Sequence, residues 1–277
     1  MADGAYRWQG NAPAPDDAQV QAIHDGYRDD QADTFAEPVR AAAVAALDRA
    51  LSTARTGDLT EAHARLTHAR SVLEDLRPEA LEPRRGLAGL FDSRTGRLKR
   101  FRAAYARAAA SIDDVARDLT GWIEGVGRRS AALDGVWADT RDAVVGLDLH
   151  LSAAHRLTGP AGETPHPLGD RKIALDACRS AALAALPLIR SVQSTDARFA
   201  DALKPCTESA AAWREDWKDA LGLTGRKPRK VRPDRDRLLR LRADLLTRID
   251  RALKELGTAR PRRADAEGKL AALRQTL

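Results

Sequence analysis

A heptad repeat of mostly apolar residues from Leu98 to Leu151 constrains this chain of 277 residues more than any other feature. The repeat lies in a run of 76 residues, from Arg84 to Gly159, that contains no proline. One stripe consists of Leu98, Tyr105, Ile112, Leu119, Val126, Leu133, Thr140 and Leu147. A second stripe consists of Phe101, Ala108, Val115, Trp122, Arg129, Val136 and Ala143. A 3-4 alternation of this length predicts a long amphipathic helix that packs against other helices.

The composition favours helices along the rest of the chain as well. Alanine, leucine and arginine are abundant, and aromatic residues make up only 4% of the sequence, which argues against a β-sandwich or barrel. We therefore predict an all-α fold, an elongated helical bundle with a long, coiled-coil-like central helical hairpin or spine.

Proline, glycine and charge divide the chain into segments. Pro38 suits the first turn of a helix, Gly57 suits a helix end, and Asp234 suits the cap of a C-terminal helix. The expected order is a disordered N-terminus (1–15), an N-terminal helical hairpin (16–83), the heptad-patterned region (84–157), a loop (158–169), a helical segment (170–224), a basic linker (225–233) and C-terminal helices (234–277).

Residues that weaken helices predict interruptions within these segments. Gly121, Gly125 and Gly127 predict a break or a close helix crossing in the heptad region. Pro187 and Pro205 predict interruptions in the helical segment that follows it. A separate short helix is expected over 264–273.

Residues with catalytic potential do not form a recognisable pattern. His63 and His68, like His150 and His155, are five residues apart, whereas two metal ligands on one helical face need a spacing of three or four. The sequence has no phosphate-binding, dinucleotide-binding, nucleophile-elbow or zinc-protease motif. Two cysteines lack metal-ligand spacing. We therefore expect no enzyme, no metal site and no cofactor.

Two basic clusters are the candidates for partner binding in a chain with a net charge of +6. The first is preceded by Arg84 and Arg85 and contains Arg94, Arg97, Lys99, Arg100, Arg102 and Arg107. The second is the basic linker, with Arg226, Lys227, Arg229, Lys230 and Arg232, followed by Arg235. Such clusters suit an acidic protein, an anionic membrane face or a phosphate backbone, and solvated helix faces and a tether are the alternative.

Arg129 is the one charged residue on the heptad stripes. An unpaired charge in a helix interface is costly, so we expect its guanidinium to pair with a carboxylate across the interface, or else to specify a partner. Trp213 and Trp217 are four residues apart on one helical face. Core packing is the favoured interpretation of this pair, and a peptide groove is the alternative.

The location predicted from the sequence is the cytoplasm. The N-terminal residues are polar and slightly acidic, which is unlike a signal peptide. The longest apolar run, Ala181 to Ile189, contains Pro187 and is too short to span a membrane.

The central region also carries a pattern of specific residues over Gly86 to Leu119 and Arg128 to Trp137: Phe91, Arg97, Phe101, Tyr105, Ile112, Asp113, Leu119, Leu133 and Asp134. This pattern resembles the toxic anion (tellurite) resistance family of TelA type. In that family a basic, aromatic lead-in precedes a long helix, and a second block ends in Ala-Leu-acidic. The resemblance implies a cytoplasmic, all-helical, non-enzymatic protein of stress response, with no catalytic residues to carry over.

These observations lead to one functional hypothesis and one rival. The hypothesis is a non-enzymatic interaction or scaffold protein that binds a protein partner or itself through its helices. The rival is a basic helical protein that binds nucleic acid or an anionic membrane surface. The two differ in salt-dependent binding to DNA or acidic vesicles.

Overall fold

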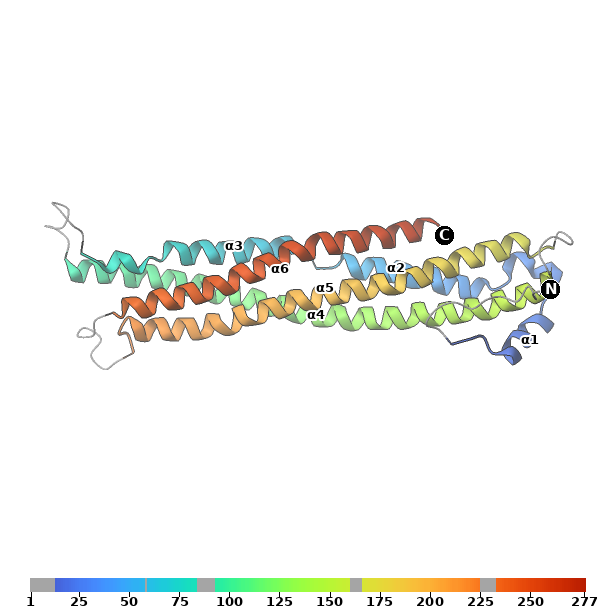
Figure 1. Cartoon of the computed structure of the whole chain (residues 1–277), viewed down its shortest axis with the longest axis horizontal. Coiled ribbons are helices and arrows are strands. Elements are labelled where there is room, and N and C mark those ends of the chain that lie inside the picture. Colours follow the sequence, from blue (N-terminus) through green and yellow to red (C-terminus); the bar gives the residue numbers. More distant parts are fainter. Residues whose placement is uncertain (1–12, 58, 84–92, 160–165, 225–232) are drawn as a thin grey trace. The chain divides into compact units, whose positions relative to one another are not determined.

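A computed structural model describes residues 13–57, 59–83, 93–159, 166–224 and 233–277, which form helices and no strand (Figure 1). The predicted all-α fold is confirmed, and the heptad region forms one long helix. The helices are α1 (Asp17–Asp25), η1 (Asp29–Thr34), α2 (Glu37–Arg55), α3 (Leu59–Asp75), η2 (Pro78–Leu81), α4 (Arg94–Thr158), α5 (Gly169–Ala220) and α6 (Arg235–Gln275).

The described residues group into two compact units, each assembled from separate parts of the chain. The first unit contains residues 13–56, 128–159, 166–195 and 262–277. The second unit contains residues 57, 59–83, 93–127, 196–224 and 233–261. Helices α4, α5 and α6 therefore contribute to both units. The hairpin expected over 16–83 is instead divided, since α2 belongs to the first unit and α3 to the second.

The core of the first unit is built from α2, α4, α5 and the end of α6. Fully buried Leu47, Leu147, Leu175 and Ile189 provide its bulk, and buried alanines of α2 and α5 fill the space between them. Small side chains on the facing surfaces allow helices to approach closely, so this core needs few aromatic residues.

The core of the second unit is built from α3, α4, α5 and α6 and contains an aromatic cluster. Trp213 and Trp217 are 3% and 0% exposed, so their predicted core packing is confirmed. The Trp217 ring stacks on Tyr105 and on Phe101, with centroids 5.7 and 6.1 Å apart. The Tyr105 hydroxyl donates to the Arg214 carbonyl at 2.7 Å. The cluster therefore fixes the start of α4 against the end of α5.

The two heptad stripes of α4 form its buried face. All stripe residues are buried except Leu98, Trp122 and Arg129, which are half-buried. The positions expected to be most buried are confirmed, because Ile112, Leu119, Val126 and Leu133 are at most 7% exposed. Both units thus use one continuous helix surface whose apolar residues recur every seven positions.

The expected break at the glycines of α4 is wrong. The helix continues through this region, and a Cβ atom added at Gly121 or Gly127 would contact nothing within 4 Å. Neither glycine therefore marks a close helix crossing. Buried Leu119 and Val126 pack this stretch of the helix into the core, so packing offsets the low helix propensity of glycine.

The prolines also fail to interrupt the later helices. Helix α5 continues through Pro187 and Pro205, and α6 continues through Pro261. The separate helix expected over 264–273 is therefore the last part of α6. Pro187 and Pro261 are exposed, so the carbonyls that their rings leave without a donor can bond water.

The predicted helix ends are found where side chains or glycine satisfy the backbone. The amide N–H of Arg237 donates to Asp234 Oδ1 at 3.0 Å, which confirms the predicted cap of α6. Gly57 follows α2 with a φ of +82°. The buried Arg263 side chain donates to the carbonyls of Ala54 and Thr56, so a cation also stabilises the C-terminus of α2.

Glu37, at the start of α2, is held by two arginines. It accepts hydrogen bonds from Arg40 at 2.7 and 2.8 Å and from Arg171 at 2.5 Å. Hydrogen bonds from Arg40 and then from Arg171 lower the pKa of Glu37 from 4.5 to about 2. The N-terminus of α2 is thereby tied to α5.

This lowered pKa predicts that part of the stability of the fold is lost in acid. The lowered pKa of Glu37 stabilises the fold fully above about pH 4.5, and this contribution declines as the pH falls toward about 2. Glu37→Gln should therefore lose less stability than the parent between about pH 6 and about pH 2.5, measured by urea unfolding. Asp244→Asn, which removes an exposed carboxylate of α6, is the control and should follow the parent. Equal acid sensitivity of Glu37→Gln and the parent would contradict this assignment.

Candidate functional site

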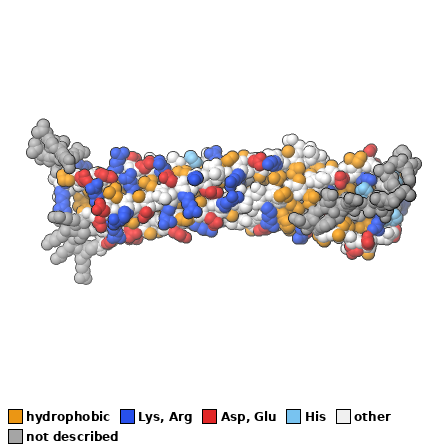
Figure 2. Space-filling model, viewed as in Figure 1, with side chains coloured by type: hydrophobic (Ala, Val, Ile, Leu, Met, Phe, Trp, Pro, Cys, Tyr) orange, Lys and Arg blue, Asp and Glu red, His pale blue; other side chains and the backbone are white. Residues whose placement is uncertain are grey.

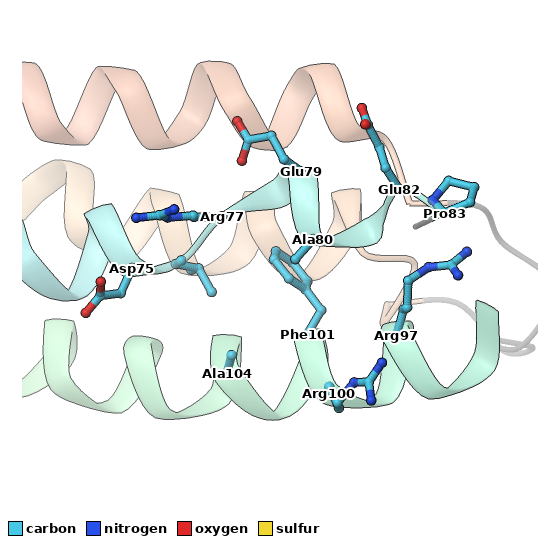
Figure 3. Close-up of a pocket in the computed structure, with 11 residues that line it drawn as sticks. Asp75, Arg77, Glu79, Ala80, Glu82, Pro83, Arg97, Arg100, Phe101 and Ala104 are labelled. Carbon is cyan, nitrogen blue, oxygen red and sulfur yellow. The ribbon is translucent and has the colours of Figure 1, made fainter. Parts of the chain in front are cut away.

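A pocket of 520 Å³ lies in the second unit, between η2 and the first turns of α4 (Figure 3). We call it the η2 pocket. It combines apolar side chains with arginines and carboxylates. The residues that line it are Asp75, Leu76, Arg77, Glu79, Ala80, Glu82, Pro83, Arg97, Arg100, Phe101 and Ala104.

Local sequence explains why the chain forms a pocket here. Helix α3 ends at Asp75, and Pro78 begins the short 3₁₀ helix η2 because its fixed φ suits a first helical position. Pro78 is buried, and so are Leu76 and Phe101, at 3% and 4% exposure. Figure 3 shows Phe101 projecting from α4 toward Ala80 of η2. The floor of the pocket is therefore apolar and closely packed.

The carboxylates of η2 turn toward α6 and meet arginines there. Glu82 pairs with Arg235, and Glu79 lies 3.9 Å from Arg242. Figure 3 shows both carboxylates pointing to the helix that supplies these arginines. Their negative charge is thus partly balanced from outside the pocket.

A second hollow of 360 Å³ adjoins the η2 pocket and shares Glu82, Pro83 and Arg97 with it. Arg94 and Arg235 also line this hollow. Together the two cavities are lined by five arginines and three carboxylates, so positive charge is in excess. The cationic residues are Arg77, Arg94, Arg97, Arg100 and Arg235, and the acidic ones are Asp75, Glu79 and Glu82.

The structure separates the six described residues of the first basic cluster into two groups. Arg94, Lys99, Arg100 and Arg107 are exposed on α4, and the first and third line the two cavities. These four residues remain candidates for partner binding. The preceding residues Arg84 and Arg85 lie outside the described part of the chain.

Arg97 and Arg102 differ from the expected exposed surface. Arg97 is only 9% exposed, and its Nε donates to the Leu81 carbonyl at 3.3 Å. Arg102 is half-buried and donates to the Leu221 carbonyl at 3.2 Å. Both share the buried side of α4 with Phe101 and join α4 to neighbouring backbone. Their binding role stays a prediction.

The other predicted site residues have different outcomes. Arg129 is half-buried in α4, and its pairing with a carboxylate stays a prediction. The basic linker lies outside the described residues and its binding role also stays a prediction: this applies to Arg226, Lys227, Arg229, Lys230 and Arg232.

Two histidines, His68 and His150, contact a hydroxyl oxygen and a backbone carbonyl oxygen, respectively. His68 Nε2 lies 2.9 Å from Ser111 Oγ, and His150 Nδ1 donates to the Gly146 carbonyl at 2.8 Å. Across the described ranges, no three His, Cys, Asp or Glu side chains are grouped as metal ligands. Burial raises the pKa of Cys178, and it raises the pKa of Cys206 to about 11, so both thiols stay protonated at neutral pH.

Sequence reasoning missed the contribution of η2 to the candidate site. Pro78 and Pro83 signal the end of a helix, and Arg77, Glu79 and Glu82 show no periodic pattern around them. The alternation of proline and charge over residues 77–83, directly before the basic cluster, was one available signal of irregular structure. It does not indicate, however, that Phe101 of α4 lies beneath η2.

Comparisons with protein-family models, curated proteins and solved structures find no match to this chain. Among the helices that the structure describes, none is long and apolar enough to cross a membrane.

Proposed function

We propose that this chain is a non-enzymatic helical interaction protein that binds an acidic protein partner through a cationic patch in its second unit. The patch consists of Arg77, Arg94, Lys99, Arg100 and Arg107, around and beside the η2 pocket. The observation that carries the proposal is that the exposed Arg77 and Arg100 line a pocket with an apolar floor, and that the exposed Arg94 lines the adjoining hollow.

Charge pairing within the second unit supports this choice. Arg65, Arg214 and Arg237 each form an ion pair, at 3.2, 2.6 and 2.8 Å. By contrast, Arg77, Arg94, Lys99 and Arg107 form no ion pair with any described residue. Unpaired exposed cations keep their attraction for anions, which speeds association with an acidic partner and directs it to this surface.

The rival function is binding to nucleic acid or an anionic membrane, and the net charge of +6 supports it. One observation favours an acidic protein. On the face drawn in Figure 2, Lys and Arg lie among Asp and Glu, unlike the continuous basic stripe typical of nucleic-acid binding.

A stress response to toxic anions is the setting that we propose for this interaction. The resemblance to the toxic anion (tellurite) resistance family supports it, and three residues of that pattern, Phe101, Ile112 and Leu119, are buried along α4. Growth of a host on tellurite with and without this chain tests the setting. No difference in growth would remove the setting and leave the interaction proposal to its own test.

Binding to labelled poly-L-glutamate at low salt tests the proposed function. Replacing Arg77, Arg94 and Lys99 by glutamine should weaken binding about tenfold, since each exposed contact contributes up to about 1 kcal/mol. The matched control replaces Arg240, Arg251 and Lys254, three exposed cations of α6, and should change binding less than about twofold. Equal losses in both triple variants, or tighter binding to duplex DNA or phosphatidylserine vesicles than to poly-L-glutamate, would overturn the proposal.

A further inference from the structure

We infer that the η2 pocket takes one apolar side chain of the acidic partner, so that the recognised segment is a short peptide with a leucine-like residue between carboxylates. This inference rests on the proposed function and specifies the chemistry of its ligand. It depends on three properties of the pocket: its floor, its size and the placement of its charges.

The floor is apolar and cannot easily rearrange. Phe101 stacks on Trp217 with an interplanar angle of 16°, and Trp217 is fully buried. Ala104, one turn further along α4, is half-buried and adds a small apolar surface beside Phe101. A rigid apolar floor gains most from an apolar group, because no side chain has to be ordered when the group binds.

The size of the cavity fits a peptide segment. Its 520 Å³ falls in the range typical of pockets that enclose small ligands and exceeds the volume of a single leucine side chain. The flanking peptide backbone and part of the neighbouring residues can therefore enter as well. The adjoining hollow of 360 Å³, which Pro83 and Arg94 line, provides room for the bound peptide to continue beyond the pocket.

The charges surround this floor at the rim. Arg77 and Arg100 are exposed residues of the lining, and Arg94 lines the adjoining hollow. Carboxylates on either side of an inserted apolar residue would reach these guanidiniums. Glu79 and Glu82 are directed to Arg242 and Arg235 of α6, which lowers their repulsion of such a ligand.

These features separate a peptide from the other anionic partners. A phosphate backbone presents no apolar group to Phe101, so it would leave the floor unused. A membrane surface is too broad to enter a cavity between η2 and α4. An acidic peptide with an apolar residue complements both the floor and the rim, so it is the ligand class that fits the pocket.

Two capped, fluorescein-labelled pentapeptides test the inference on the full chain. One has four glutamates around a central leucine, and the other has glycine in place of the leucine. The parent protein should bind the leucine peptide about tenfold more tightly in fluorescence anisotropy, the gain typical of burying most of one leucine side chain. Equal binding of the two peptides would overturn the inference without depending on any variant.

A pair of variants then locates the preference. Ala104→Leu fills the floor of the pocket and should reduce the leucine preference to less than about twofold. Ala103→Leu adds the same group at an exposed neighbouring position outside the pocket and should keep the tenfold preference. A preference that survives Ala104→Leu in the folded variant would place the leucine elsewhere and overturn the inference.

The outcomes also distinguish this inference from the proposed function. If both peptides bind equally and both lose affinity in the Arg77, Arg94 and Lys99 triple variant, the acidic-partner function stands and only the pocket inference is wrong. If neither peptide nor poly-L-glutamate binds the parent protein, both are wrong.

Discussion

Replacing Asp148 with alanine is expected to destabilise the first unit by about 3–5 kcal/mol. The side chains of Asp148 and Arg179 are 1% and 8% exposed, and their Oδ1 and Nε atoms are 2.5 Å apart. Removing the carboxylate leaves a buried guanidinium without this partner, and a charge in that environment is costly. Urea unfolding followed by far-ultraviolet circular dichroism measures the change in the free energy of unfolding.

Two controls make this result specific to burial. Asp139→Ala removes the carboxylate of an exposed pair with Arg49, also in the first unit, where the two side chains are 56% and 51% exposed. It should cost at most about 1 kcal/mol. The double variant Asp148→Leu with Arg179→Met removes both charges and should be near neutral or stabilising. Similar losses of unfolding free energy in Asp148→Ala and Asp139→Ala would show that breaking the buried pair costs no more than breaking an exposed one.

The sequence singled out Arg129 but gave no signal for the buried Asp148. Arg129 interrupts a heptad stripe and is half-buried, whereas Asp148 lies outside both stripes and is 0% exposed as a residue. Within the first unit the buried face of α4 includes Val144, Leu147 and Leu151, spaced by three and four. A straight helix has 3.6 residues per turn and drifts about 20° from a strict heptad in every seven residues. The stripe therefore identifies the helix but not its whole buried surface.

Local patterns also overestimated how often the helices are interrupted. Gly121 and Pro187 weaken a helix in isolation, but in each case the neighbouring turns bury apolar side chains in a core. Tertiary packing contributes more than the roughly 1 to 3 kcal/mol that one such residue costs. The all-α fold was predictable because its apolar periodicity recurs over many turns, whereas helix continuity depends on contacts far apart in the sequence.

The candidate site was predictable only in its charges. The exposed Arg94, Lys99 and Arg100 belong to the basic cluster that the sequence displays. The pocket itself depends on η2 lying over Phe101, which brings residues about twenty positions apart together. Phe101 has two roles that one stripe position cannot reveal, since it belongs to the core and also forms the floor of the pocket.

Leu119→Ala is expected to destabilise the second unit by about 2–5 kcal/mol. Leu119 is 3% exposed and faces Leu66 of α3 and Ile249 of α6. The gap between these helices measures only about 10 Å³, so the core is closely packed and the variant creates a new cavity. Chemical unfolding should show a smaller loss for Leu98→Ala, because Leu98 lies on the same stripe but is only half-buried. Equal losses at the two positions would mean that burial along the stripe does not set the stability of this core.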